Sequence, residues 1–237
     1  MKSIKFIVIF VFVILSLVSF GYTHELFQAS ANFSLGFPQN EFKDNVNQIG
    51  FSGVGHFVYN FRNSPFSMGL SLGYLVYGSE TREERFSITV PDVLLNVTTT
   101  NNIFLCHFLF RVQPPKGRLR PYLDGLIGLN YLYTNTKVLS QRFSEDNPIA
   151  RTNIYNDLVF SYGAGGGLMI EVLSIKKEKR EGFFVMYIDL AARYLKGGRA
   201  EYLKKGSIHL ENDQVLYDVN RSTTDLVTGY IGVSFSF

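Results

Sequence analysis

Residues 224–237 read TDLVTGYIGVSFSF, and this stretch decides the fold. From Val227 to Phe237 the side chains alternate between apolar residues and residues that are polar, small or tyrosine, and the chain ends on an aromatic. A period of two predicts a β-strand. One face of this strand suits hydrocarbon and the other suits polar surroundings, which is the pattern of a strand in a membrane barrel wall.

The opposite end of the chain predicts export. Lys2 and Lys5 precede an apolar run over residues 6–20, and Gly21 follows as a small residue suited to processing. This arrangement predicts a secretory signal peptide over residues 1–21. A retained helix is the alternative, but the run is shorter than the roughly 20 residues that span a bilayer. We therefore expect a cleaved leader, 1–21, and a barrel domain, 22–237.

Composition narrows the possible partners and cross-links. The formal net charge is +3, and removal of Lys2 and Lys5 with the leader lowers it to +1. A nearly neutral protein is not expected to bind nucleic acid. Cys106 is the single cysteine, and an intramolecular disulfide is therefore impossible. No cofactor is expected.

Alternation bounded by turn residues predicts eight strands. Their connections alternate between short and long, and the long ones lie near 38–47, 79–100, 135–155 and 197–223. Short turns on one side and long loops on the other predict an all-β, eight-stranded antiparallel up-and-down transmembrane β-barrel, with periplasmic turns and extracellular loops. The expected strands are 26–37, 48–61, 66–78, 101–113, 120–134, 156–174, 182–196 and 224–237.

The two faces of the strands distinguish a membrane barrel from a soluble one. The outward residues of the third strand include Met68, Leu70 and Leu72, whereas Ser67 and Ser71 point inward. This apolar-out, polar-in pattern is the reverse of a lipocalin-like barrel, which needs an apolar lumen and a wettable exterior. A secreted lipocalin-like barrel is the main alternative. Eight strands leave an interior that side chains can fill, so we expect no large pore.

The leader, the eight alternating segments, the segment 120–131 and the closing residues 234–237 together resemble the small bacterial outer-membrane β-barrel superfamily of OmpA-type and OmpX-type barrels. Residues 194–203 also resemble a loop common in such proteins of the Bacteroidetes group. The resemblance implies integral residence in the outer membrane of a Gram-negative cell envelope. It also implies insertion by the outer-membrane assembly machinery, with Phe235 and Phe237 as the assembly signal.

Charged and histidine side chains on the inward faces are the candidate site residues. We expect Arg111, Asp124 and Glu171 at a similar depth near the periplasmic end, and Asp189 and Arg193 higher on the seventh strand. An unpaired buried charge is costly, so these residues predict an internal salt-bridge network, with a proton or ion gate as the alternative. The expected polar network comprises Arg111, Asp124, Glu171, Asp189, Arg193, His56 and His107.

Catalytic and metal chemistry receive little support from the sequence. Ser52 lies four residues before His56 on the same face, which permits a Ser-His pair, but no further motif accompanies it. Cys106 and His107 point to opposite faces and cannot share a metal ion. The glycines of 163–167 lack a following Gly-Lys-Ser/Thr, so they predict close packing and not a phosphate loop.

The sequence thus predicts a non-enzymatic outer-membrane barrel with a filled polar lumen and a structural or surface-interaction role. Its expected partners are outer-membrane lipid and lipopolysaccharide, the assembly machinery, and an extracellular or envelope protein bound through loops 79–100 and 197–223. The alternatives are an outer-membrane lipid-modifying enzyme, such as a lipid A acyl-chain hydrolase or transferase, and an accessory subunit of a secretion or motility complex.

Overall fold

The computed structural model describes residues 25–62, 64–87, 90–140, 150–177, 182–211 and 214–237. The expected leader, residues 1–21, lies outside these ranges. The barrel strands are β1 (Phe27–Pro38), β2 (Gly50–Asn60), β3 (Phe66–Ser87), β4 (Val90–Val112), β5 (Leu119–Ser140), β6 (Ala150–Lys177), β7 (Gly182–Gly197) and β12 (Leu226–Ser236).

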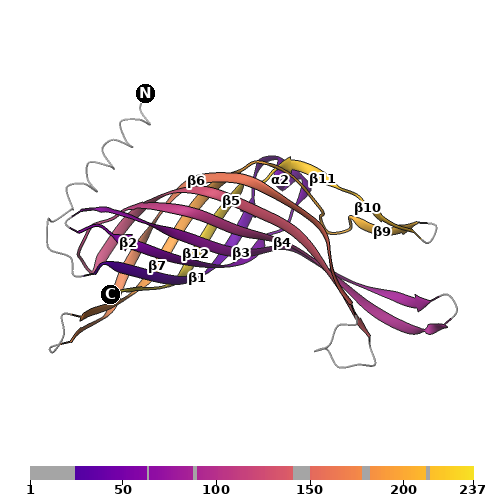
Figure 1. Ribbon diagram of the computed structural model, residues 1–237, viewed down its shortest axis with the longest axis horizontal. Helices are drawn as coiled ribbons and strands as arrows, with labels where there is room; N and C mark the ends of the chain where they lie inside the picture. The colour runs from indigo at the N-terminus through magenta and orange to yellow at the C-terminus, as the bar shows by residue number, and fades with distance from the viewer. Residues whose placement is uncertain (1–24, 63, 88–89, 141–149, 178–181, 212–213) are drawn as a thin grey trace.

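These eight strands form one closed antiparallel barrel in the order β1-β12-β7-β6-β5-β4-β3-β2 (Figure 1). The first and last strands complete the ring, because Phe27 and Phe237 exchange two backbone hydrogen bonds of 2.9 Å. Closure pairs the strand edges, which hydrocarbon requires because no water is present to satisfy backbone groups. The predicted fold class is confirmed.

Four strands continue well beyond the barrel on the side of the long connections. β2 pairs with β3 only as far as Phe51 and Val76, yet β3 and β4 stay paired out to Ser87 and Val90. β5 and β6 also extend past the ring, so β3 to β6 build a four-stranded extension (Figure 1). The prediction that 79–100 and 135–155 are loops is therefore wrong for residues 79–87, 90–100, 135–140 and 150–155, which are strand, while residues 88–89 and 141–149 lie outside the described ranges. These segments are hairpin arms whose alternation is interrupted by too many polar residues to be recognised as strand.

The first and last long connections also contain regular structure. Residues 38–47 include a short helix, α2 (Asn40–Asn45). Residues 197–223 contain two small hairpins, in which β8 (Arg199–Tyr202) pairs with β11 (Asn220–Thr223) and β9 (Ile208–Glu211) pairs with β10 (Gln214–Tyr217). We call α2 together with residues 197–223 the cap. No helix in the described part of the chain is long and apolar enough to cross a membrane.

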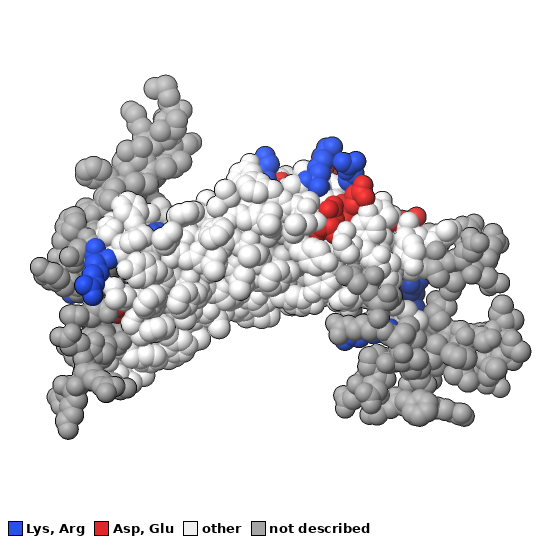
Figure 2. All heavy atoms as spheres, viewed as in Figure 1, with Lys and Arg blue, Asp and Glu red and all other residues white. Residues whose placement is uncertain are grey.

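The outer wall of the barrel is apolar all the way round. Within the barrel wall, for example from Phe27 to Phe37 on β1 and from Phe184 to Tyr194 on β7, the outward positions of the described ranges carry no charged side chain. Charged outward residues begin at the cap end and on the extension, such as Lys196 on β7 and Lys137 on β5. Figure 2 shows one face of this band without Lys, Arg, Asp or Glu, while charged residues lie toward the two ends. The most exposed members include Phe108 at 62%, Phe51 at 60% and Phe66 at 57%.

The height of the outer wall suits a membrane. β1 has 12 residues, and β2 and β12 have 11 each. At about 3.3 Å per residue and a tilt of about 45°, such strands rise about 25 Å, which is the height of the apolar band of outer-membrane barrels. Tyrosines concentrate toward the cap side of the wall, where a ring with a polar tip suits an interface with water. They are Tyr74, Tyr131, Tyr133, Tyr162 and Tyr194.

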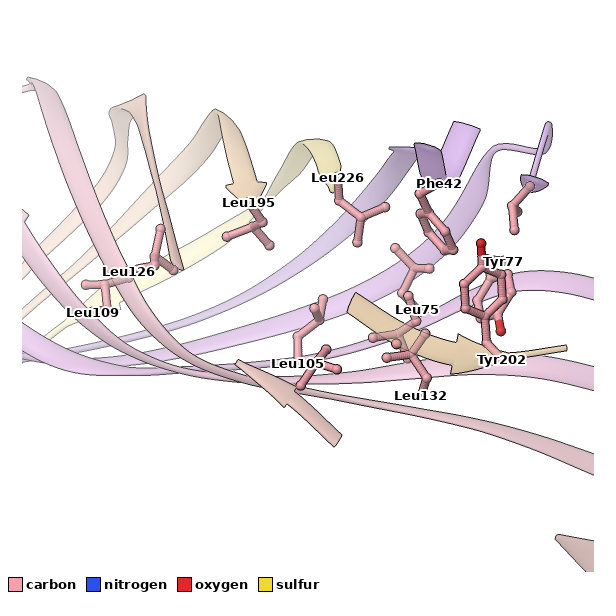
Figure 3. Packing of buried hydrophobic residues seen from close by; sticks show 14 of the residues in the cluster. Phe42, Leu75, Tyr77, Leu105, Leu109, Leu126, Leu132, Leu195, Tyr202 and Leu226 are labelled. Carbon is pink, nitrogen blue, oxygen red and sulfur yellow. The ribbon is translucent and has the colours of Figure 1, made fainter. Parts of the chain in front are cut away.

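The lumen is filled differently in its two halves. The half nearer the turns carries charged and hydroxyl side chains, whereas the half nearer the cap is packed with leucines, including Leu75, Leu105 and Leu195 (Figure 3). The prediction of a polar lumen throughout is therefore wrong for the cap half. The inward leucines of β4 and β5 are present in the sequence. Because the outward residues of these strands are also apolar, the alternation did not reveal that the lumen there is apolar.

Candidate functional site

An ion network crosses the lumen in the half nearer the short turns. Arg111 on β4 donates two hydrogen bonds to Asp124 on β5, with nitrogen–oxygen distances of 2.7 and 3.0 Å. Arg193 on β7 reaches the same carboxylate at 2.6 Å. The Arg111 guanidinium also stacks 3.7 Å from the ring centre of Tyr122. All three charged side chains are almost fully buried, and we call them the lumen network.

The depths predicted for these residues are partly wrong. Arg193 was expected above Asp124, yet its guanidinium lies 2.6 Å from the Asp124 carboxylate, so the two charged groups meet at one depth. Barrel strands are tilted and staggered, so counting residues from a strand end does not give depth in the lumen.

Glu171 does not join the lumen network. It lies on β6 opposite Tyr187, close to the register shift between Glu171 and Leu173, and it is only half-buried. No ion pair with another described residue includes Glu171. The position that faces Asp124 on β6 is instead Gly165.

Glycines on β6 make the lumen network possible. A side-chain Cβ at Gly165 would lie 2.5 Å from Cγ of Arg193 and 2.4 Å from the backbone oxygen of Ala192. A Cβ at Gly167 would lie 2.6 Å from the ring of Tyr122. The 163–167 run therefore provides space for the ions and rings, as its position within a strand predicted.

Asp189 is held by tyrosines. The Tyr122 hydroxyl donates a 2.6 Å hydrogen bond to Oδ1 of Asp189, and the hydroxyls of Tyr122 and Tyr230 are 2.9 Å apart. Tyr122 thus links Asp189 to the lumen network, because its ring face also carries the Arg111 guanidinium.

A second buried ion pair lies at the turn-side mouth of the lumen. Arg120 donates two hydrogen bonds to Glu25, at 2.8 and 3.1 Å. The backbone oxygen of Glu25 accepts a 3.1 Å hydrogen bond from Asn60. Sequence reasoning missed this pair because Glu25 precedes the first strand and has no alternating context. The inward position of Arg120, two residues before Tyr122, was the available signal.

The two inward histidines are buried as expected but form no catalytic pair. The His56 ring packs edge-on against Tyr230 with ring centres 5.6 Å apart. Ser52 donates instead to the backbone oxygen of Gly53. Neither ring nitrogen of His56 has a hydrogen-bond partner among the described residues, and the same holds for Nε2 of His107. No Ser-His hydrogen bond thus joins Ser52 to His56.

Metal chemistry has no assembled ligand set in the described ranges. Cys106 is exposed on the outer wall between Leu72 of β3 and Leu129 of β5, whereas its neighbour His107 is buried in the lumen. No group of three or more His, Cys, Asp or Glu residues in the described part of the chain is placed to hold a metal ion.

The cap seals the other end of the lumen. Phe42 of α2 is fully buried, with its ring 5.6 Å from Tyr77 of β3 and 5.2 Å from Tyr202 of β8 (Figure 3). The Tyr77 hydroxyl donates a 3.0 Å hydrogen bond to the backbone oxygen of Leu203. These aromatic contacts continue the leucine packing of the lumen upward into the cap.

The cap is also bonded to both edges of the strand extension. On the β3 edge, Arg82 donates to the backbone oxygen of Ile208, and Glu80 accepts a 2.8 Å hydrogen bond from the Gly206 amide. On the β6 edge, the Tyr155 hydroxyl donates to Glu201 at 2.5 Å. The described parts of segments 79–100 and 197–223, which were singled out from the sequence, are therefore bonded to each other.

Comparisons with known proteins give structural likeness only. No protein-family profile matches the chain, and no curated protein matches it. Neisserial surface protein A (NspA) is 10% identical with a TM-score of 0.38, covering 91% of this chain and 97% of that chain. Ail of Yersinia pestis, solved with the heparin analogue sucrose octasulfate, is 14% identical with a TM-score of 0.30, covering 90% and 97%.

A major outer membrane protein from Thermus thermophilus is 9% identical with a TM-score of 0.29, covering 88% of this chain and 99% of that chain. At these scores the likeness carries no argument about function. The architecture is instead assigned from the closed ring of eight strands and the uncharged outer wall. The chain has the architecture of a small outer-membrane β-barrel.

Proposed function

We propose that the protein is an integral outer-membrane barrel that acts as a structural and surface-interaction element, and not as a pore or an enzyme. The outer wall carries this proposal. Exposed large apolar residues, such as Phe33 at 54%, Phe57 at 50% and Phe160 at 53%, would face water on a soluble protein. Monomeric soluble proteins rarely expose contiguous apolar patches of more than a few hundred Å².

The filled lumen supports a role without a large pore. The Glu25–Arg120 pair lies at the periplasmic mouth, the lumen network lies above it, and leucines fill the cap half. A ring of eight strands has an interior just wide enough for side chains. Both arginines of the lumen network bond the shared Asp124 carboxylate and are held in place by it, so we assign the lumen a structural role.

The extracellular structure supports a role in surface interaction. With the short turns in the periplasm, the strand extension and the cap project outside the cell. Binding residues often lie on segments held by a rigid scaffold. The cap is fixed to the barrel rim, because Asp225 accepts hydrogen bonds from Asn40 at 2.7 Å and from the Gly197 amide at 3.1 Å. We propose segments 79–100 and 197–223 as the surface that an envelope or extracellular protein would contact.

Assembly and export complete the proposal. Phe235 packs against Phe184 with ring centres 5.6 Å apart, and Phe237 lies 6.2 Å from Phe27 at the strand that closes the ring. We propose Phe235 and Phe237 as the residues that the outer-membrane assembly machinery reads, after removal of residues 1–21. Replacing Phe237 by serine should reduce barrel assembly in cells, measured as the folded fraction in outer-membrane preparations.

Heat-modifiability tests the proposed membrane barrel. The mature protein, refolded in detergent, should migrate faster on a gel unboiled than boiled, with a β-rich far-UV circular dichroism spectrum. Protease added to intact cells should cleave only within the extension and the cap. A protein that stays soluble without detergent and shows no mobility shift would contradict the proposal. That result would favour the alternative, a secreted lipocalin-like barrel.

A further inference from the structure

A cleft in the cap combines positive charge with side-chain amides. It has a volume of about 270 Å³ and lies where residues 45–48 meet the top of β3 and the turn at 204–207. Its polar lining comes from Asn45, Asn47, Gln48, Lys204 and Lys205. No carboxylate belongs to this lining among the described residues, so the two ammonium groups make the cleft a site for an anion.

The walls of the cleft are fixed in place. Tyr77, which lines its floor, is buried and bonded to the Leu203 backbone at 3.0 Å. The lysine turn closes on itself, because the Lys204 amide donates to Ser207 Oγ at 3.2 Å and the Ser207 amide donates to the Lys204 oxygen at 3.1 Å. Gly206 has a φ of +83°, which favours glycine in this turn.

Carboxylates of the described residues lie beside the cleft but do not line it. Glu80 accepts the Gly206 amide hydrogen at 2.8 Å and so lies beside the turn. Asp218 also lies beside the turn, because its amide donates to the Ser207 oxygen at 2.8 Å, and Asp44 directly precedes Asn45. None of these carboxylates belongs to the lining, where the two lysines are the charged residues that the structure describes. A cleft lined by two ammonium groups, and by amides that can bond hydroxyl groups, fits a phosphorylated sugar.

The cleft lies directly above the lipid-facing wall. Gln48 is followed by Ile49, which is 53% exposed, and by Phe51, which is 60% exposed and packs against Phe33 with ring centres 6.4 Å apart. Three residues span at most roughly 10 Å of chain. The polar headgroup region is about 5–8 Å thick on each side of the hydrocarbon core. The cleft therefore opens at headgroup level, with an apolar surface for acyl chains beneath it.

We infer that this cleft binds the phosphorylated sugar headgroup of an outer-leaflet glycolipid. Lys204 and Lys205 pair with the phosphate, and the amides of residues 45, 47 and 48 bond the sugar hydroxyls. The acyl chains of the same lipid lie along Ile49 and Phe51. This inference rests on the proposed membrane location, and it names one lipid class and one site for the outer surface.

The test measures binding of fluorescent diphosphorylated lipid A to the folded full-length protein in detergent. The variant combines Lys204→Ala with Lys205→Ala. The control combines Lys116→Ala with Arg118→Ala, which removes the same charge from exposed positions on the β4–β5 turn at the opposite end. Each lysine near an anionic lipid surface contributes a factor of about five in affinity, so the cap variant should bind about thirtyfold more weakly.

The control variant should bind lipid A with the affinity of the unmodified protein. Dephosphorylated lipid A should bind the unmodified protein weakly, with about the affinity that the cap variant has for lipid A. The inference would be overturned if both variants lost the same affinity for lipid A, or if removing the phosphates from lipid A left its affinity unchanged. Equally tight binding of soluble glucosamine 1-phosphate would also overturn it, because no acyl contact would then be needed. Heat-modifiability of the same samples separates this failure from failure of the proposed membrane barrel.

Discussion

The two halves of the barrel lumen are filled by opposite chemistry. In the half nearer the short turns, Asp124 binds Arg111 and Arg193 in a buried network. In the cap half, Leu75, Leu105 and neighbouring residues pack as they would in a soluble protein core. Both halves lie inside the same uncharged outer wall. The membrane thus dictates the outside of the barrel, whereas the inside needs only to be filled and to leave no charge unpaired.

The largest expected effect comes from breaking the charged half. Asp124→Ala leaves two buried arginines without their shared carboxylate. Removing one partner of a buried ion pair costs about 3–5 kcal/mol of folding free energy. Urea unfolding of the barrel in lipid vesicles, followed by gel mobility, measures the loss. A change below about 1 kcal/mol, the typical value for an exposed pair, would show that the network is solvated.

A triple variant sharpens the same point. Arg111→Met, Asp124→Leu and Arg193→Met together replace the network by apolar side chains of similar size. Such replacements of buried ion networks are often neutral or stabilising by about 1–4 kcal/mol. The triple variant should therefore recover most of the stability that Asp124→Ala loses. A triple variant as unstable as the single one would contradict this account of the lumen.

The apolar packing in the cap half of the lumen is tested by a substitution that leaves a cavity there. Leu105 is 5% exposed in the cap half of the lumen, so Leu105→Ala should cost about 2–5 kcal/mol of unfolding free energy. The matched control is Leu70→Ala on the outer wall, where Leu70 is 43% exposed. Lipid can fill the space left there, so its loss should be clearly smaller in the same unfolding assay. Equal losses would mean that the assigned faces are wrong.

A smaller loss of unfolding free energy is expected when a side chain is added where β6 and β7 pack closely beside the lumen network. Gly165→Ala would bring a Cβ within 2.4 Å of the Ala192 backbone oxygen, which must move. Overpacking of this kind costs about 1–3 kcal/mol. Gly229→Ala is the control, because a Cβ at Gly229 meets no atom within 4 Å. Unfolding midpoints of the two variants should differ, and equal midpoints would contradict the close approach of β6 and β7.

The smallest effect concerns the junction of the cap and the extension. The hydrogen bond from Tyr155 to Glu201, together with burial and the nearby charges of Glu201 and Asp157, raises the pKa of Tyr155 to about 12. A raised pKa means that the contact is intact below pH 10 and is lost as pH rises through about 12. The absorbance titration of the protein minus that of Tyr155→Phe should show this late step. A difference step near pH 10 would contradict the contact.

The fold followed from the sequence because one physical constraint acts on every strand. Hydrocarbon excludes charge from one face, so residues such as Leu70, Phe108 and Ile188 recur with a period of two. The same signal fails beyond the membrane. Water tolerates polar residues on both faces of a strand, and the arms of β3 to β6 therefore resembled loops.

The lumen was less predictable, because its contacts depend on strand stagger. Arg111 and Asp124 were expected at similar depth, and they are direct partners in the register. Arg193 was placed too high, and Glu171 lies outside the network. Glu25 was missed because a residue before the first strand has no pattern to mark it. The cap cleft was equally invisible, since it joins residues 45–48 to residues 204–205, which are distant in sequence.

The central claim is that the outer wall faces lipid, and the single cysteine tests it most directly. Cys106 lies on that wall between Leu72 and Leu129. A nitroxide attached to Cys106, with the protein in lipid vesicles, should collide often with oxygen, which dissolves in hydrocarbon, and rarely with a water-soluble nickel chelate. A nitroxide at Lys137→Cys in a Cys106→Ser background, on an exposed residue of the β5 arm, should show the reverse. Nickel access at Cys106 equal to that at position 137 would contradict the membrane barrel.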